Sequence, residues 1–584
     1  MKLAACLLVL CVAAQAETVP RSTIRVGVWT LWHDHEAIVT PVSGATLREC
    51  ESCRAHSLQT ITVRAKGAEL TWTERNGQAH SATVILLAGS YRLDAHGESL
   101  RLAWPLRITA QHGALLLVAT LPVESYVELA VAAESGAADS PESRKALAVV
   151  ARGFALAPAH GHTGFDVCDL THCQWVHWRT SREAHAAALA TAGEVLWFHG
   201  TRAGVYFHQN CGGRTAAADE VWPGRAASGR EVRGLLVSRA DPFCQRVGSS
   251  EWSATLSRVE LTHALSASGL VAPGWTSLSV VQRGESGRAT WLLVGESRIP
   301  AESFRLGVGR TLGWNRIRSN WFEVSAAADG FLFHGRGSGH GVGLCQAGAA
   351  EMAREGHGYR EILAQYFPGS TLAEETTGSP WQSLSGQGFT LETSEAADAA
   401  FVPDLVHALA EAESHSGLTP RAAIAVRAYR STPAFRNATL APGWVAAFTE
   451  GDMIAVQPLR ILSARKLLAG SLRHEFLHAL VEEQATAQTP LWLREGLVEA
   501  WATALQRELG APSFRVFSDE RVGNAMTPEL IDQKLAHAAT EAESEAAHRA
   551  AGWYAQQLLD RFGRAQVLDW LRTGVPQSAL ATLR

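Results

Sequence analysis

Long apolar runs, a positive net charge and internal repeats are all lacking in this chain. Beyond residue 16, no segment reaches the roughly 20 apolar residues that a membrane-spanning helix needs, so we expect no transmembrane segment. The formal net charge is -5 at pH 7, which argues against a nucleic acid as partner, because phosphate binding relies on basic residues. The densest glycine segment, GRGSGHGVGLCQAG, has no Gly-Lys-Ser/Thr ending, which excludes a phosphate-binding loop there.

The N-terminus carries the pattern of a secretory signal. MKLAACLLVLCVAAQAETVP has a lysine, a short apolar run and then AQA, the small-x-small pattern of a cleavage site. We therefore expect residues 1–16 to be a signal peptide and the protein to be exported to the periplasm, the cell envelope or the extracellular space. Cys6 and Cys11 would leave with it, so seven of the nine cysteines remain. An odd number in an oxidising compartment predicts that at least one thiol is unpaired or bound to a metal.

Length and pattern predict several domains. At 584 residues the chain exceeds what one hydrophobic core usually serves. Strand-like runs separated by turns prevail in the first part, the stretch after Pro368 is rich in Gly, Ser and Thr, and helical patterns prevail beyond it. We predict a multidomain protein: a strand-rich α+β domain at 17–372, a linker at 373–395 and a mostly helical α+β domain at 396–584.

Three helices are expected inside the strand-rich part. VESYVELAVAAE has apolar residues at helical spacing. Ser140 and Pro141 fit the N-cap and first position of a second helix, ESRKALAVVARGFALA. A further helical pattern lies near residues 256–268.

The segment LRHEFLHALV has the spacing of a zinc peptidase site. Residues at i and i+4 share one helix face, so His474 and His478 can bind one zinc ion while Glu475 stands beside it as a general base. A second predicted helix, PLWLREGLVEAW, offers Glu495 as third ligand and Glu499 as a residue that orients a ligand histidine. The alternative is a chance HExxH match on an exposed helix.

From about residue 400 onward the chain resembles the gluzincin-type, peptidase MA-like metallopeptidases. The resemblance lies in AFTEGDMIAVQPL, WLREGLVEAW and HRAAGWYAQQLLDRFG. Relatives often carry a tyrosine near the start of that late helix, where this sequence has His548, with Tyr554 further along. Either side chain could stabilise the oxyanion of a tetrahedral intermediate, and either could equally be a plain surface residue.

A second candidate metal site lies in the first domain. HGHTGFDVC and DLTHCQW bring together the potential ligands His162, Cys168, His172 and Cys173. Two thiolates and two imidazoles form the closed tetrahedral set that holds structural zinc. A disulfide between Cys168 and Cys173 fits the spacing equally well in an exported protein.

Residues 22 to 372 resemble the stage II sporulation protein D (SpoIID)/LytB family. The motifs, in order, are IRVGV, LPVESYVELAVAAE, KALAVVARGFAL, FDVCDLTHCQ, NCGGRT and GHGVGLCQAGAAEMAREGHGYREILAQYFPG. The resemblance implies peptidoglycan as substrate and lytic transglycosylase action on its glycan strands. LytB itself is described as an enhancer of an amidase. The resemblance also favours zinc over a disulfide at the His/Cys site.

Lytic transglycosylase chemistry needs one carboxyl group that acts first as an acid and then as a base. Glu134 is the candidate, because it ends AVAAE where relatives usually read Glu-x-Pro, and apolar neighbours would raise its pKa. The proline is absent here, since the text is ESGAADSP. Glu124 suits a structural cap, and Glu128 is expected on the solvent face of the same helix.

The glycine-rich segment before residue 346 would let backbone approach a sugar closely. His340 and Gln346 could then hydrogen-bond glycan groups, although a turn packed beneath the sheet fits the pattern equally well. Among the other cysteines, Cys211 could form a disulfide with Cys244. Cys50 and Cys53, in a CxxC pattern, could form a small disulfide loop or contribute two ligands to a second metal site. Cys345 is then left without a cysteine partner.

The sequence thus predicts an exported peptidoglycan-remodelling enzyme: a lytic transglycosylase-type domain followed by a zinc-dependent peptidase domain. The alternative is a non-catalytic, glycan-binding activator of a cell-wall amidase, with a peptidase-like interaction domain. The missing proline after Glu134 slightly favours that alternative.

Overall fold

The computed structural model describes residues 23–582 apart from several short gaps. The gaps are residues 75–76, 137–138, 158–160, 172, 224–233, 249, 442–444, 452, 509–525 and 538–540. The predicted signal peptide, residues 1–16, and the candidate zinc ligand His172 therefore lie outside the described residues. Within them, no helix combines the length and apolar character needed to cross a membrane.

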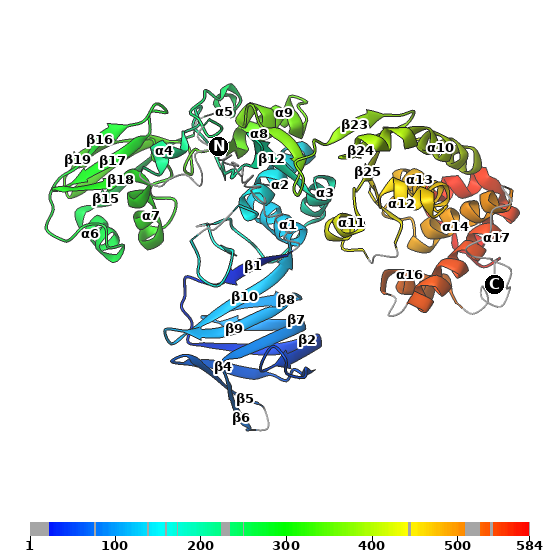
Figure 1. The fold of residues 1–584 in the computed structure, drawn as a ribbon, viewed down its shortest axis with the longest axis horizontal. Coiled ribbons are helices and arrows are strands. Elements are labelled where there is room, and N and C mark those ends of the chain that lie inside the picture. Colours follow the sequence, from blue (N-terminus) through cyan, green and yellow to red (C-terminus); the bar gives the residue numbers. More distant parts are fainter. Residues whose placement is uncertain are drawn as a thin grey trace, which may run out of the picture.

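A large sheet forms the N-terminal part of the molecule, drawn in blue in Figure 1. Its strand order is β11-β1-β10-β9-β7-β2-β4-β5-β6, with β3 beside β2 and β8 beside β7. The predicted series of strands is present, and buried residues alternate with more exposed ones along several of them. The strands are β1 (Thr23–Val28), β2 (Glu36–Arg48), β3 (His56–Ser57), β4 (Ile61–Lys66), β5 (Glu69–Thr73), β6 (Ala79–Ala82), β7 (Val84–Ala95), β8 (Glu98–Leu102), β9 (Leu106–Gln111), β10 (Ala114–Pro122) and β11 (Val167–Cys168).

A helical layer lies against this sheet and shares one continuous hydrophobic core with it. The predicted start of the second helix is confirmed, because the Ser140 side chain accepts a hydrogen bond from the Ser143 N–H and Pro141 is the first helical residue. The helices are α1 (Val123–Glu134), α2 (Pro141–Ala155), α3 (Arg182–Ala190), α8 (Gln346–Arg354) and α9 (Tyr359–Tyr366). A small sheet of β12 (Glu194–Phe198), β13 (Thr201–Arg202) and β22 (Thr371–Glu374) joins the layer.

A lobe with its own hydrophobic core is inserted into this domain, to the left in Figure 1. The chain leaves after β14 (Phe207–His208), passes α4 (Ala218–Val221) and α5 (Pro242–Arg246), and returns at β21 (Leu344–Cys345), which pairs in parallel with β14. The sequence predicted strands and one helix here but no separate lobe. The lobe contains β15 (Glu251–Ser257), α6 (Arg258–Ala267), β16 (Leu278–Arg283), β17 (Ala289–Val294), β18 (Ser297–Pro300), α7 (Ala301–Leu312), β19 (Phe322–Ala327) and β20 (Gly330–Arg336).

The C-terminal part is mostly helical and packs around a five-stranded sheet of order β23-β24-β25-β27-β26. The predicted coarse fold is therefore confirmed: a multidomain chain with a strand-rich first part and a helical last part. Strands and helices are β23 (Gln382–Ser385), β24 (Phe389–Thr393), η2 (Ala396–Phe401), α10 (Val402–Ser416), β25 (Ile424–Ala428), α11 (Thr432–Thr439), β26 (Ala447–Glu450), β27 (Met453–Val456), α12 (Leu459–Ala464), α13 (Leu468–Gln484), α14 (Leu491–Glu508), α16 (Pro528–His537), α17 (Glu541–Thr573) and α18 (Gln577–Leu580). Helix α17 is interrupted at Gly563, whose φ is 77°.

The stretch 373–395, which we expected to be a linker, contains the end of β22 and two further strands. Strand β22 pairs with β12 of the first domain, whereas β23 and β24 belong to the second sheet. Phe389 and Leu391 are buried at alternate positions. Short strands dominated by Ser, Thr and Gly have too few apolar residues to show this alternation in the sequence alone.

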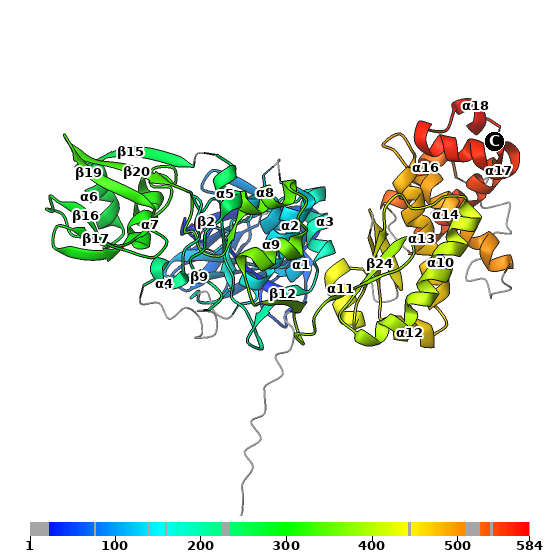
Figure 2. The ribbon, with the colours of Figure 1, turned by 90° about the horizontal axis from the view of Figure 1, so that it is seen from above.

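Figure 2 shows the C-terminal part attached beside the helical layer of the first domain. At the junction, the buried Arg427 of β25 donates hydrogen bonds to Glu194 Oε1 at 3.0 Å and to the carbonyl of Ala192 at 2.8 Å. Its guanidinium carbon lies 3.7 Å from the centroid of the Trp381 ring. Because the Glu194 side chain is fully buried, this ion pair ties the second sheet to the first domain.

Replacing Arg427 with alanine should destabilise the protein by about 3–5 kcal/mol, because the Glu194 carboxylate would remain buried without its main cation. Urea unfolding measures the change. Arg92→Ala is the matched control: its Nε lies 2.9 Å from Asp94 Oδ2, with side chains 52% and 28% exposed, so its loss should cost about 0–1 kcal/mol. Equal effects of the two substitutions would contradict the assigned role of Arg427.

Candidate functional site

Glu134, the last residue of α1, is held by two segments that are distant in sequence. Its Oε1 accepts a hydrogen bond from the Trp175 N–H at 3.0 Å, and its backbone carbonyl accepts one from Gln346 Nε2 at 2.9 Å. Burial raises the pKa of Glu134 to about 7, although the hydrogen bond from Trp175 opposes that rise. A carboxyl with such a pKa can both give and take a proton near neutral pH.

The segment that contacts Glu134 is anchored by the candidate His/Cys metal site. The Cys173 sulfur lies 3.1 Å from His162 Nε2 and 3.2 Å from the Cys168 sulfur, a separation longer than the roughly 2.05 Å of a disulfide bond. These three ligand atoms thus come together as the sequence predicted, and they suit zinc. Trp175, whose N–H donates to Glu134, follows Cys173 by two residues.

The other two glutamates of α1 have charged partners. Glu124 is buried and forms an ion pair with Arg152, with Nε–Oε1 at 2.9 Å and Nη2–Oε2 at 2.5 Å, instead of capping the helix. Glu128, expected to face solvent, is half-buried and lies 2.9 Å from His185 Nδ1. Helix α1 therefore presents three carboxyls in different settings, and that of Glu134 accepts a neutral backbone N–H.

The two proposed glycan-binding residues are placed apart. Gln346 contacts the Glu134 backbone, as described above. His340 belongs to an aromatic group, with ring centroids 5.2 Å from Trp222 and 5.6 Å from His208, and its Nδ1 accepts the Val342 N–H at 3.0 Å. Burial lowers the pKa of His340 to about 4. These contacts match the packing alternative for His340.

In the C-terminal part, α13 and α14 bring the HExxH residues together. The Nε2 atoms of His474 and His478 lie 3.1 Å apart, and His478 Nε2 lies 3.8 Å from Glu495 Oε2. His478 thus lies near both other candidate ligands, but the three residues are not among the described groups whose ligand atoms all lie within 4.8 Å of one another. Glu475 is buried, its Oε2 accepts a hydrogen bond from Thr449 Oγ1 at 2.7 Å, and burial raises its pKa.

The structure separates the two candidates for oxyanion stabilisation. His548 Nε2 lies 3.5 Å from Glu495 Oε2, at the edge of the candidate metal site. Tyr554 is buried, and its hydroxyl donates to the carbonyl of Met526 at 3.1 Å. Glu499 lies one helical turn after Glu495, is 5% exposed and acts electrostatically on His548.

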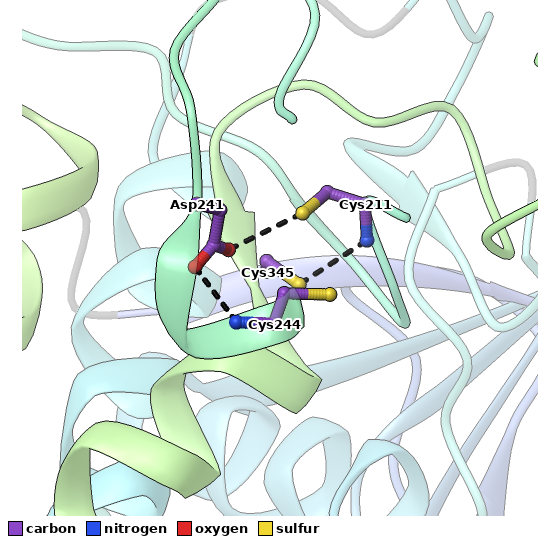
Figure 3. Close-up of side chains that lie close together, drawn as sticks. All are labelled: Cys211, Asp241, Cys244 and Cys345. Carbon is purple, nitrogen blue, oxygen red and sulfur yellow. Dashed lines mark hydrogen bonds between the residues drawn. The ribbon is translucent and has the colours of Figure 1, made fainter. Parts of the chain in front are cut away.

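The structure also contains a cluster of potential metal ligands that the sequence did not predict. Cys211, Cys244 and Cys345 meet Asp241 in the interior of the first domain (Figure 3). In the sequence, Asp241 in DPFC looks like an ordinary helix N-cap. The three cysteines are too far apart in the chain to form a recognisable metal-binding motif. By contrast, Cys50 and Cys53 form a disulfide, which was one of the two alternatives for that pair.

The raised pKa of Glu134 predicts how stability changes with pH. Its usual pKa near 4.5 applies to the unfolded chain, so the folded protein holds the proton more tightly. The resulting stabilisation is complete below pH about 4.5 and is lost as pH rises toward 7, by at most about 1.4 kcal/mol per pH unit.

The side chain introduced by Glu134→Gln cannot titrate, so the variant does not lose this stabilisation as the pH rises. The melting temperature of Glu134→Gln minus that of the unmodified protein should therefore increase between pH 5 and pH 8. Glu98→Gln, at an exposed position of β8, is the control and should keep the original pH dependence. A difference between Glu134→Gln and the unmodified protein that stays constant with pH would contradict the assignment.

Two known domain families match parts of the chain. The family described as Stage II sporulation protein (SpoIID) matches residues 111–198. This range contains α1 with Glu134 and the His/Cys site. A domain of unknown function (DUF8618) matches residues 230–343, the range of the inserted lobe and the segment before it.

Three relatives are similar over less than half of this chain. Stage II sporulation protein D of Bacillus subtilis is 27% identical over 299 residues, which are 47% of this chain and 80% of that protein. The amidase enhancer of Bacillus subtilis is 24% identical over 295 residues, or 41% of this chain and 39% of that protein. An uncharacterised protein of Brachyspira hyodysenteriae is 29% identical over 268 residues, 44% of this chain and 69% of that protein. The first part of the chain thus carries a SpoIID-type domain with relatives named for sporulation and for amidase enhancement.

Proposed function

We propose that the first domain remodels peptidoglycan by lytic transglycosylase-type cleavage of glycan strands, with Glu134 as the only acid and base. The observation that carries this proposal is the Glu134 carboxyl, whose pKa burial raises to about 7 and whose hydrogen-bond partner is an uncharged N–H. The match of residues 111–198 to the SpoIID family supports the choice of substrate. The predicted signal peptide fits export to the cell envelope.

Glu134 would carry one proton through the reaction. The protonated carboxyl donates to the glycosidic oxygen as the bond from that oxygen to the muramic acid C1 breaks. The carboxylate then accepts the proton of the same sugar's C6 hydroxyl while that oxygen bonds to C1, which closes an anhydro ring without water. Trp175 holds the carboxylate, and Gln346 holds the backbone behind it.

The absent proline after Glu134 has a structural counterpart. Gly136 stands at the third position of the usual Glu-x-Pro, and its N–H donates to Asp139 Oδ2 at 2.7 Å. Proline has no N–H and could not make this bond. The Gly136 carbonyl also accepts from Arg144 Nη2 at 3.0 Å. Hydrogen bonds to the N–H and the carbonyl of Gly136 therefore fix the backbone at the position where relatives usually have proline.

Incubation with purified peptidoglycan followed by mass spectrometry tests this proposal. The unmodified protein should release anhydro-muramic products, and Glu134→Gln should lower that release at least a hundredfold while folding normally. Glu128→Gln on the same helix is the matched control and should keep most of the activity. Undiminished release by Glu134→Gln would overturn the assignment.

A second candidate function is activation of a cell-wall amidase without cleavage of glycan. The similarity to a protein named amidase enhancer and the missing proline after Glu134 favour it. The same experiment separates the two functions when an amidase is added. If neither Glu134 form releases sugars and both accelerate the amidase, the domain acts as an activator.

We further propose that the C-terminal part is a zinc-dependent peptidase of gluzincin type. The proximity of His478 to His474 and to Glu495 supports it, and these three residues would hold the ion. Zinc would supply Lewis-acid activation of water and of the scissile carbonyl. Glu475 takes the proton of the attacking water, and His548 donates to the developing oxyanion. Its substrate would be the peptide part of the same polymer or a protein partner.

Substitutions in this site should have three distinct effects. Glu475→Gln should keep zinc and thermal stability but lose peptidase activity, because only the base is removed. His478→Ala should lose one zinc equivalent and the activity. Glu499→Ala should weaken zinc binding by roughly ten- to a hundredfold, because it orients a ligand without binding the metal. Metal analysis with a peptidase assay measures all three, and unchanged zinc content in His478→Ala would refute the site.

A further inference from the structure

Three cysteines and one aspartate converge in the interior of the SpoIID-type domain (Figure 3). Their ligand atoms, the sulfurs of Cys211, Cys244 and Cys345 and a carboxylate oxygen of Asp241, all lie within 4.8 Å of one another. Each residue is at most 2% exposed. They come from three segments: the chain after β14, the start of α5, and β21.

Backbone donors converge on one of the sulfur atoms. Cys345 Sγ accepts hydrogen bonds from the N–H groups of Cys211 at 3.2 Å and Gly348 at 3.5 Å. The Cys244 sulfur lies 3.3 Å from Asn210 Oδ1. Donors that converge on sulfur stabilise the thiolate, which is the form that binds metal.

The carboxylate of Asp241 is oriented toward the sulfurs by two fixed contacts. Its Oδ1 accepts the Cys244 N–H at 2.9 Å, and its Oδ2 accepts the Tyr366 hydroxyl at 2.8 Å. The same Oδ2 lies 3.2 Å from Cys211 Sγ. A ligand whose position is set by outer hydrogen bonds is typical of protein metal sites.

A buried arginine neighbours the group. Arg288 donates to the carbonyls of Cys211 at 2.6 Å and Arg214 at 2.8 Å. Its Nε has no hydrogen-bond partner among the described residues. A divalent cation held by the three sulfurs and the carboxylate would balance the negative charge that these ligands carry when they bind a metal.

We propose that Cys211, Asp241, Cys244 and Cys345 bind a structural zinc ion, separate from the His/Cys site and from the HExxH site. Three thiolates and a carboxylate form a closed tetrahedral set, and thiolates favour zinc over calcium or magnesium. The burial of all four residues leaves no open position for a substrate.

This ion would clamp the base of the inserted lobe. Cys244 precedes the lobe and Cys345 follows it, so one metal closes the intervening loop and lowers the entropy of the unfolded chain. Cys345 also precedes Gln346, whose side chain holds the Glu134 backbone. The zinc therefore links the position of the lobe to that of the candidate catalytic carboxyl.

The competing arrangement is a disulfide between Cys211 and Cys244. In the structure the Cys211 sulfur is directed to Asp241, and these three cysteines carry no disulfide, whereas Cys50 and Cys53 are bonded. The two arrangements differ in metal content and in free thiols.

Metal analysis of the full chain, purified without chelator, tests the proposal. Cys345→Ser should contain one zinc equivalent less than the unmodified protein. The double variant Cys50→Ser/Cys53→Ser, which removes the disulfide, is the control and should keep its zinc. Alkylation of the unmodified protein in denaturant with chelator and without reductant should label Cys211, Cys244 and Cys345.

Two results would overturn the site: a peptide that links Cys211 to Cys244, or unchanged zinc content in Cys345→Ser. If Cys345→Ser does not fold, Asp241→Asn takes its place, because the amide keeps the size of the side chain and removes one ligand charge. It should release one zinc equivalent to a chelator at least tenfold faster than the unmodified protein. Equal rates would likewise overturn the proposal.

Discussion

The burial of Glu194 is the constraint on which the arrangement of the two halves depends. Out of water, its carboxylate needs a cation, and Arg427 of the C-terminal part supplies it. The carbonyl of Glu194 in turn accepts from Arg152, which also holds Glu124 of α1. A continuous set of buried charges thus runs from the second sheet to the helix that ends in Glu134.

Helix α1 shows how environment, and not residue type, assigns chemical roles. Glu124 is matched with an arginine and serves to hold helices together, and Glu128 faces His185. Glu134 is buried at the helix end, where its partner is the uncharged N–H of Trp175, so the proton is retained to a higher pH. That N–H lies two residues after Cys173 of the His/Cys site.

Sequence patterns predicted the structural features that depend on residues close together in the chain. The strand-like runs between turns, the start of α2 at Ser140 and the shared face of His474 and His478 follow from patterns of a few residues. The inserted lobe was missed because its strands look like those of the main sheet, and periodicity does not state which sheet a strand joins. The meeting of Asp241 with three distant cysteines depends on tertiary structure and leaves no signal in local spacing. The separation of His548 from Tyr554 needed the packing of α17, since both lie on one helix.

The inserted lobe begins and ends at neighbouring points. The Gly337 N–H donates to the carbonyl of Ser250 at 3.0 Å, and Asn210 and Ser338 form a β-bridge beside it. A segment with its own core and adjoining ends can be lengthened, exchanged or lost in evolution without moving the strands that carry it. At this point of the chain the first domain can therefore carry insertions of different size while its main sheet and helical layer keep their positions.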